Sequence, residues 1–235
     1  MPRPIALTLL LLTSLLPAQG PEIVEPITCP FTEEEMTIDG ALTEDIWRET
    51  EPLSFFLPIT HAAPSAETVG RVCWGESDLF VALSASDEDL LAVLTDHDSE
   101  TYHDDVLEIF LMPGDRSSGH HFIEINALGT VADGHTDRLG KSWNAVGLRI
   151  GIALDGTLND STDRDRGWCL EVAIPFATLE PRGACLPWGG DQWLFHLARY
   201  DYTSTRMGDP ELSSCAPLTR VYFHNTADWI PLRFE

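Results

Sequence analysis

Short segments with strand-type alternation of apolar and polar residues follow one another through most of the chain, and this pattern restricts the fold more than any other feature. Turn residues such as Gly75, Gly129 and Gly189-Gly190 separate many of the segments. Only two short helices are indicated, one capped by Thr43 and one turn at residues 175–179. We therefore predict an all-β fold, a single antiparallel β-sandwich with jelly-roll or immunoglobulin-like layers. The predicted strands are residues 53–57, 68–74, 79–86, 106–112, 121–126, 130–133, 148–154, 168–174, 193–200 and 229–234.

The first twenty residues, 1–20, have the features of a secretory signal peptide rather than of a folded element. A positively charged start precedes the apolar run of residues 5–16, and residues 18–20 form a small-x-small cleavage site. The apolar run is too short to span a bilayer. We expect the protein to be secreted or periplasmic, with a proline- and glutamate-rich lead at residues 21–36 and one sandwich domain at residues 37–235.

Export permits disulfide bonds, and the sequence contains five cysteines. An odd number leaves at least one cysteine without a partner inside the chain. Cys73 and Cys169 lie in apolar strand segments and are interpreted as small buried residues. Cys185 and Cys215 lie in loop-like segments, so a bridge between them is predicted. No CxxC spacing occurs, which argues against a zinc ribbon or a redox dithiol.

The formal charge of −24 restricts the partners of the protein. Such a chain repels a nucleic-acid backbone and an anionic membrane surface, whereas neutral ligands, cations and basic partners are compatible with it. The acidic balance is explained either by solubility or by calcium, which binds carboxylate oxygens. Asp104 and Asp105, at the start of strand 106–112, are the candidate calcium ligands, and no acidic loop matches an EF-hand.

Ionisable residues recur on one face of several predicted strands, opposite to an apolar face. Alternation places Glu108, Glu124 and Glu171 on such polar faces, together with His196 or Arg199. If the strands are neighbours, these side chains share one sheet surface. That surface is either the solvated outer face of the sandwich or a binding surface.

Several segments also occur in the order found in carbohydrate-binding module family 9, and the chain resembles that family over residues 36–235. The segments are "TIDGALTEDIW", "VGRVCWGESDLFVALSASDEDL", "HDDVLEIFLMP", "FIEINALGTVAD", "RGWCLEVAIPFATL", "DQWLFHLARYD" and "FHNTADWIPLRF". The resemblance implies a β-sandwich that binds oligo- or polysaccharides, including their chain ends, without cleaving them. Members often contain structural calcium and serve in polysaccharide degradation, attached to glycoside hydrolases or as separate exported proteins.

The resemblance also implies a glycan slot between two aromatic side chains, which fall on Tyr102 and Phe223. An acidic residue beside the slot corresponds to Glu108. An aromatic ring offers a large contact to the apolar face of a sugar, and a carboxylate accepts hydrogen bonds from its hydroxyl groups. The chain departs from the family at Glu124, where known members have an arginine, and Arg199 is a possible substitute. Further candidate ligand-binding residues are Asn126, His224 and Asn225.

Three alternatives to sugar binding remain open at this point. Glu124 in place of an arginine is consistent with a structural or protein-interaction sandwich that has lost sugar binding. Glu108 and Glu124, if they face each other across neighbouring strands about 5 Å apart, have the spacing of a carboxylate-pair glycoside hydrolase. A related sandwich class binds haem, for which Met112 with His121 or His196 are candidates. The resemblance favours a binding module that is not an enzyme and has no organic cofactor.

Overall fold

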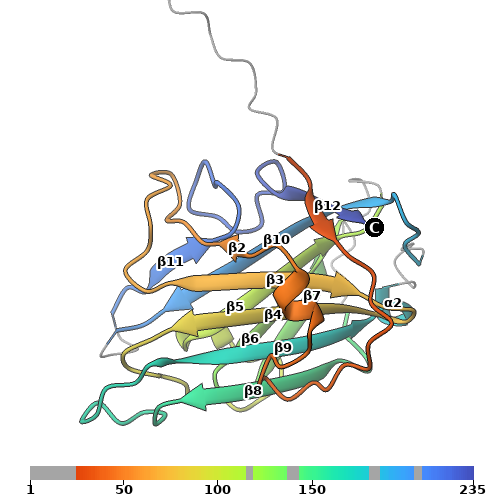
Figure 1. The fold of residues 1–235 in the computed structure, drawn as a ribbon. Coiled ribbons are helices and arrows are strands. Elements are labelled where there is room, and N and C mark those ends of the chain that lie inside the picture. The colour runs from red at the N-terminus through yellow and green to blue at the C-terminus, as the bar shows by residue number, and fades with distance from the viewer. Residues whose placement is uncertain (1–24, 115–118, 137–142, 180–185, 204–207) are drawn as a thin grey trace, which may run out of the picture.

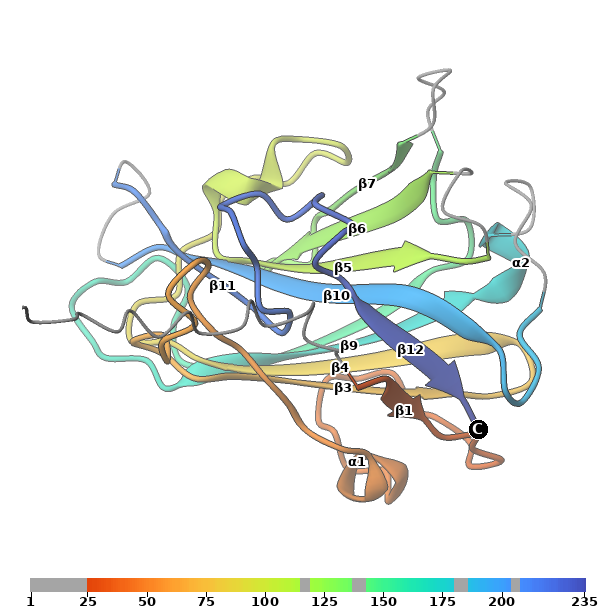
Figure 2. The same ribbon diagram turned by 90° about the horizontal axis from the view of Figure 1, so that it is seen from above.

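The structure is a computed structural model that describes residues 25–114, 119–136, 143–179, 186–203 and 208–235. The predicted signal peptide and Cys185 lie outside these residues. Two β-sheets pack face to face, as the views in Figures 1 and 2 show. This architecture confirms the predicted all-β sandwich.

The seven-stranded sheet carries the surface that is important for the site. Its order is β1 (Ile27–Cys29), β12 (Ile230–Phe234), β10 (Gln192–Asp201), β5 (Val106–Met112), β6 (His120–Asn126) and β7 (Val131–Thr136), with β11 (Glu211–Ser214) paired to β10. The five-stranded sheet has the order β2 (Leu53–Ser54), β3 (Thr68–Trp74), β4 (Asp78–Ser86), β9 (Gly167–Pro175) and β8 (Arg149–Asp155).

Alternating apolar residues from the two inner faces form the core. Leu107 and Ile109 of β5 and Leu83 and Leu170 of the five-stranded sheet are fully buried. The sheets approach closely at β3, where a Cβ added to Gly70 would lie 2.4 Å from Cδ1 of Leu197. Burial of these aliphatic side chains is the main source of stability in such a fold.

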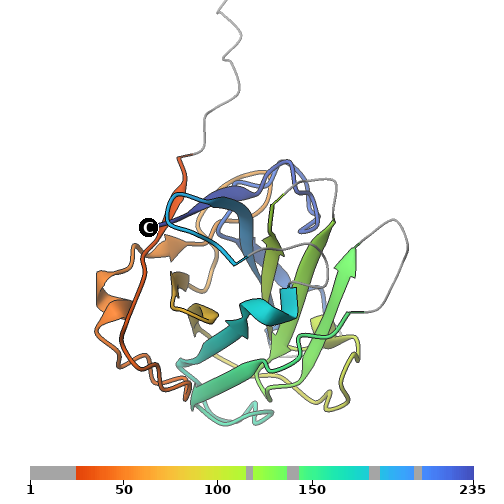
Figure 3. The same cartoon turned by 90° about the vertical axis from the view of Figure 1, so that its right-hand side faces the viewer.

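The sequence did not predict β1 and β11. β1 lies within the segment interpreted as an N-terminal lead, and it pairs in parallel with β12, whereas the other strand pairs of the described residues are antiparallel. Figure 3 shows the C-terminus beside this first strand. Two backbone hydrogen bonds, from Phe31 N to Glu235 O and from Glu235 N to Cys29 O, hold the two ends together.

Both predicted helices are present, although the first differs in its cap. α1 (Ile46–Glu49) begins after Asp45 rather than Thr43, and Trp47 anchors it on the outer face of the five-stranded sheet (Figure 2). α2 (Phe176–Leu179) follows β9 as expected. None of the helices in the described part of the chain is long and apolar enough to cross a membrane.

The cysteines do not support the predicted bridge. Cys215 is a buried free thiol that accepts a hydrogen bond from Leu197 N at 3.2 Å, and its predicted partner Cys185 lies outside the described residues. Cys29, Cys73 and Cys169 are also free thiols. Cys73 is fully buried, as its strand position predicts, and Cys169 is partly exposed.

Candidate functional site

Glu108 and Glu124 lie directly opposite each other on the neighbouring strands β5 and β6. Ala198 of β10 is the partner of Glu108 on the other side, so His196 and Tyr200 share this face of the sheet. The face is not solvated, because His196 is fully buried and Glu108 is only 3 % exposed. The interpretation of this surface as a solvated outer face is therefore wrong.

Two segments cover the face. One is η1 (Thr101–His103), which precedes β5, and the other is the β11–β12 connection, residues 215–229. The indole N–H of Trp229 donates to the carbonyl oxygen of Phe223 at 2.8 Å, and the ring of Trp229 stacks on that of His196. The connection is thus fixed against the sheet.

A cavity of about 260 Å³ remains between the sheet and these two segments. Five of the predicted site residues line this cavity. They come from three separate parts of the chain, namely η1 with β5, β6, and the β11–β12 connection. The predicted lining residues are Tyr102, Glu108, Glu124, Phe223 and His224. Four further residues line the cavity that were not predicted from the sequence: Tyr200, Leu212, Val221 and Tyr222. Of these, Tyr200 had a usable signal, since alternation from His196 places it on the same face.

The two predicted aromatic residues occupy different environments. Tyr102 is partly exposed, and its hydroxyl group donates to Oε1 of Glu100 at 2.8 Å. Phe223 is only 5 % exposed and packs edge-on against Tyr200, with ring centroids 5.4 Å apart. Its neighbour Tyr222 is 54 % exposed and also lines the cavity. Tyr222 therefore offers more accessible ring surface than Phe223.

Burial shifts the pKa values of both carboxyl groups of the cavity upward. Burial, and to a lesser degree the neighbouring Glu124, raises the pKa of Glu108 well above its usual range. Burial also raises the pKa of Glu124, although the hydroxyl group of Thr101, which donates to Oε2 at 2.8 Å, opposes that shift. The two groups titrate as a pair, because ionising one makes it harder to ionise the other.

The histidine of the cavity is neutral. His224 Nδ1 lies 2.8 Å from Nε2 of His120, and the two imidazoles share a hydrogen bond. Burial lowers the pKa of His224, and burial together with His224 lowers the pKa of His120 to about 3. His224 therefore contributes a polar ring rather than a positive charge.

Two candidate residues do not line the cavity. Asn126 is buried, and its amide group donates to Oδ2 of Asp104 at 2.8 Å and to Leu94 O at 2.9 Å. Asn225 donates to Oδ2 of Asp228 at 2.6 Å inside the β11–β12 connection. Both support the segments around the cavity and do not face a ligand there.

Two other polar residues lie elsewhere than the shared-surface prediction placed them. Glu171 belongs to the other sheet, where it accepts a hydrogen bond from the indole N–H of Trp47 at 2.9 Å. Arg199 points to the inner face of its sheet and is 1 % exposed. It contacts Asp87 Oδ2 at 2.9 Å and Asp201 Oδ1 at 3.3 Å. Arg199 therefore does not substitute for an arginine at position 124.

The candidate calcium ligands serve mainly as acceptors for backbone N–H groups. Asp104 Oδ2 accepts hydrogen bonds from Val93 N and Leu94 N. Asp105 accepts from Leu91 N at 2.6 Å and from Tyr202 N at 2.7 Å. These bonds tie the residues after β4, and Tyr202 directly after β10, to the start of β5.

Asp105 also belongs to a buried acidic cluster with Asp87 and Asp201, whose ligand atoms lie within 4.8 Å of one another. Burial raises the pKa of Asp105 to about 8 and that of Asp201 to about 6. Calcium needs six to eight oxygen ligands. Here Arg199 already forms ion pairs with Asp87 and Asp201. Both carboxyl oxygens of Asp105 accept backbone hydrogen bonds. The cluster does not fit a calcium site.

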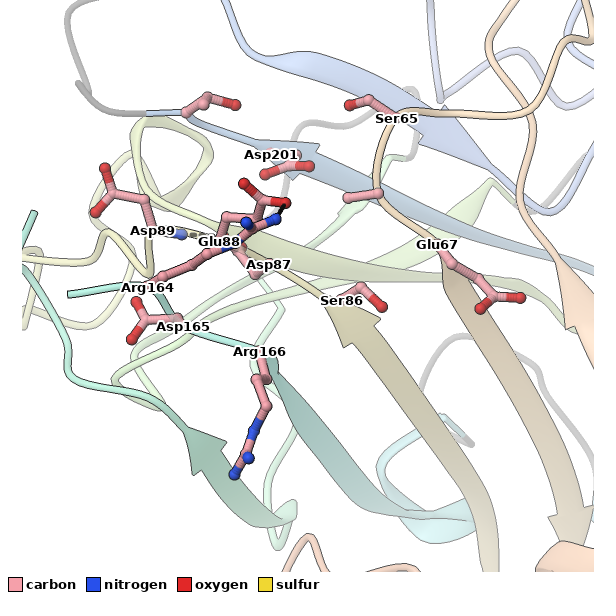
Figure 4. A pocket seen from close by; sticks show the side chains of 12 residues that line it. Ser65, Glu67, Ser86, Asp87, Glu88, Asp89, Arg164, Asp165, Arg166 and Asp201 are labelled. Atoms are coloured by element: carbon pink, nitrogen blue, oxygen red, sulfur yellow. Dashed lines mark hydrogen bonds and ion pairs between the residues drawn. The ribbon is translucent and has the colours of Figure 1, made fainter.

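A larger cavity of about 640 Å³ opens next to this cluster (Figure 4). Charged side chains dominate its wall, and several are paired with each other or with neighbours, such as Arg164 with Glu88 and Arg166 with Asp155. The twelve described residues that line it include no aromatic ring. It lacks the flat apolar surface that the cavity of Tyr102 and Tyr222 provides.

Comparisons with known proteins give one family match and several similar solved structures. The model of a family described as carbohydrate family 9 binding domain-like matches residues 38–230. A carbohydrate-binding module of family 9 from Caldicellulosiruptor kristjanssonii in complex with cellotriose is similar in structure, with a TM-score of 0.62, 15 % identity, and 90 % and 94 % of the two chains covered. The complex of a family 9 module from the same organism with glucose is also similar, with a TM-score of 0.63 and 16 % identity. This match covers 90 % of this chain and 96 % of the other.

A putative carbohydrate-binding protein from Bacteroides uniformis ATCC 8492 has a TM-score of 0.70 and 13 % identity, and the match covers 90 % of this chain and all of the other. The comparison with curated proteins gave no significant match. At these identities the solved structures establish a shared fold.

Proposed function

The chain belongs to the carbohydrate family 9 binding domain-like family, and we propose that its glycan site is the cavity between Tyr102, Tyr222 and the two glutamates Glu108 and Glu124. The family consists of non-catalytic carbohydrate-binding modules, so the protein binds a saccharide without cleaving it. Secretion by the predicted signal peptide is part of the proposal, because it brings such a module to polysaccharides outside the cell.

The convergence of distant residues on one cavity carries this proposal. Tyr102 comes from η1, the glutamates from β5 and β6, and Tyr222 from the β11–β12 connection. Aromatic rings bind the apolar face of a pyranose, and carboxyl groups bind its hydroxyl groups. This combination of a few polar groups and apolar walls is typical of a ligand site.

The size of the cavity limits what it can hold. Its volume of about 260 Å³ lies below the range of roughly 300–1,000 Å³ that is typical for drug-sized ligands. A single sugar residue is the matching size, so we infer that the site binds one terminal unit of a glycan chain. The related modules that bind glucose and cellotriose support a saccharide of this kind.

Calorimetric titration with soluble mono- and oligosaccharides tests the proposal. We expect saturable binding that weakens about tenfold in Tyr102→Ala, which corresponds to a loss of about 1.4 kcal/mol. Trp188→Ala is the matched control, because Trp188 is 76 % exposed and does not line the cavity. Absence of saturable binding to every sugar, or equal losses in the two variants, would contradict the proposal and favour an interaction domain instead.

A further inference from the structure

The ionisable side chains of the proposed glycan site are mainly acidic. Its nine lining residues include Glu108 and Glu124 and no lysine or arginine. We propose, on the premise that this cavity is the glycan site, that it selects amino sugars, which carry a protonated amine, over neutral hexoses and over sugar acids. The inference thus names the chemical class of the ligand that the proposed function leaves open.

Glu108 is the main reason to expect a cationic ligand. Its side chain is almost completely buried and faces the cavity, and within the described residues it has no hydrogen bond or ion pair. A buried carboxylate without a partner is unfavourable, so native proteins almost always pair such a group. The carboxyl group of Glu108 faces the cavity, where a donor group of a bound ligand can reach it. An ammonium group supplies both a positive charge and three N–H donors.

The position of Glu124 opposite Glu108 is a second reason to expect a cation in the cavity. Because Glu108 and Glu124 are directly opposed across two strands, their Cβ atoms are separated by roughly 4.5–5.5 Å. Like charges at that position repel each other. A cation bound between them removes the repulsion and pairs with both carboxylates, whereas the hydroxyl group of a neutral sugar donates a single hydrogen bond without charge.

The groups around the two glutamates do not neutralise them. His224 is uncharged because it is buried and bound to His120, and Arg199 points away to the inner face of the sheet. At the edge of the cavity, Glu100 accepts the hydroxyl hydrogen of Tyr102 and adds further negative charge. Tyr200, which also lines the cavity, has a pKa raised by burial and stays neutral. The carboxylates of Glu100, Glu108 and Glu124 would therefore repel a sugar that carries a carboxylate of its own.

The aromatic walls suit a cation as well as a sugar. A cation within about 6 Å of a tyrosine ring is attracted to the face of that ring. Tyr102 and Tyr200 have ring centroids 6.2 Å apart, and Tyr222 completes the wall. The rings bind the apolar face of the sugar and also favour its ammonium group.

Titration with four sugars of the same ring shape tests the inference: glucose, glucosamine, N-acetylglucosamine and glucuronic acid. The experiment is run at low salt and at a pH where the amine of glucosamine is protonated. We expect glucosamine to bind at least about tenfold more tightly than glucose, and acetylation of the amine to abolish this preference. Glucuronic acid should bind most weakly.

Variants locate the effect within the cavity. Glu108→Gln and Glu124→Gln keep the shape of the side chains and remove one charge each, so each should reduce the preference for glucosamine while glucose still binds. Glu51→Gln, at an exposed position, is the matched control and should keep the preference. Thermal denaturation of each variant shows that it is folded.

The outcomes separate the inference from the proposed function. Glucose binding equal to or tighter than glucosamine binding overturns the inference and supports the proposed function. Failure of all four sugars and of their oligomers overturns both. Equal affinity for glucosamine and for methylammonium, or a preference that persists in both glutamine variants, also overturns the inference. A preference that calcium ions remove at low millimolar concentration overturns it too, because the cavity is then a metal site.

Discussion

Glu108 and Glu124 are cross-strand partners on the covered face of the seven-stranded sheet, and Glu108 has no hydrogen-bonding or ionic partner within the described part of the chain. In most sheets such a position holds an apolar residue or an oppositely charged pair. The protein thus keeps two mutually repelling carboxyl groups in a place where they weaken the fold. Sites of ligand binding are the usual location of such local conflicts between stability and function.

The first prediction concerns the pH dependence of stability. Because burial raises the folded-state pKa of Glu108 above the ordinary value of 4.5, the folded protein binds a proton more tightly than the unfolded chain does. The contribution of this group to stability is therefore fully present below pH 4.5 and is lost as the pH rises through the folded-state value. Denaturant titrations at a series of pH values should show this loss, and Glu108→Gln should reduce it.

The same variant should be more stable than the parent protein at neutral and alkaline pH. Glutamine carries no charge to desolvate, and it relieves the repulsion with Glu124. In a chain of this size each 1 kcal/mol corresponds to a shift in Tm of about 2–4 °C. Glu51→Gln, at an exposed position, should leave the pH profile unchanged. A Glu108→Gln protein that is less stable at high pH would show that the carboxylate has a favourable role in the free protein.

Alternation along the strands made part of this site predictable. A period of two places Glu108, Glu124, His196 and Tyr200 on the faces where the structure has them, and the flat, apolar core faces follow from the same rule. The pairing of strands does not follow from it. Glu171 has the same alternation as Glu124 and yet lies in the other sheet, because only the tertiary fold decides which strands are neighbours.

The loops explain the remaining differences. The sequence points to Phe223 as the second aromatic residue, but the orientation of adjacent residues in an irregular loop has no periodicity from which to predict it. In the structure both residues line the cavity, but Phe223 is only 5 % exposed whereas Tyr222 is 54 % exposed. The parallel strand β1 was also missed, since three residues are too few for a pattern to be recognised.

A second prediction follows from the orientations of Tyr222 and Phe223. Tyr222→Ala should lower the affinity for sugar with little effect on stability, because exposed positions change the free energy of unfolding by about 0.5 kcal/mol or less. Phe223→Ala should instead destabilise the protein by about 3–5 kcal/mol, since it empties a buried aromatic position. Calorimetry and thermal denaturation on both variants measure the two effects. The reverse pattern would show that Phe223 is the ring that contacts the ligand.

A third prediction concerns calcium. Because Arg199 neutralises part of the Asp87–Asp105–Asp201 cluster, addition of calcium should leave the Tm unchanged, and so should removal of metal with EDTA. An ion that binds only the folded protein must raise the Tm, and the rise grows with the ratio of the ion concentration to its Kd. Magnesium is the control for general effects of ionic strength. A rise in Tm with calcium and not with magnesium would support Asp104 and Asp105 as calcium ligands.

The last prediction concerns Arg199 itself. Its guanidinium group is buried and contacts Asp87, Asp201 and the hydroxyl group of Thr68, so Arg199→Met leaves two buried carboxylates without their cation. Removal of one partner from a buried ion pair costs about 3–5 kcal/mol, whereas neutralising the remaining partner recovers much of the loss. Arg199→Met should therefore unfold at a markedly lower temperature, and adding Asp87→Asn should restore part of the difference. Arg48→Met, at an exposed ion pair with Asp45, is the control and should change the Tm little. If the double variant is no more stable than Arg199→Met, the arginine stabilises the fold by packing rather than by charge.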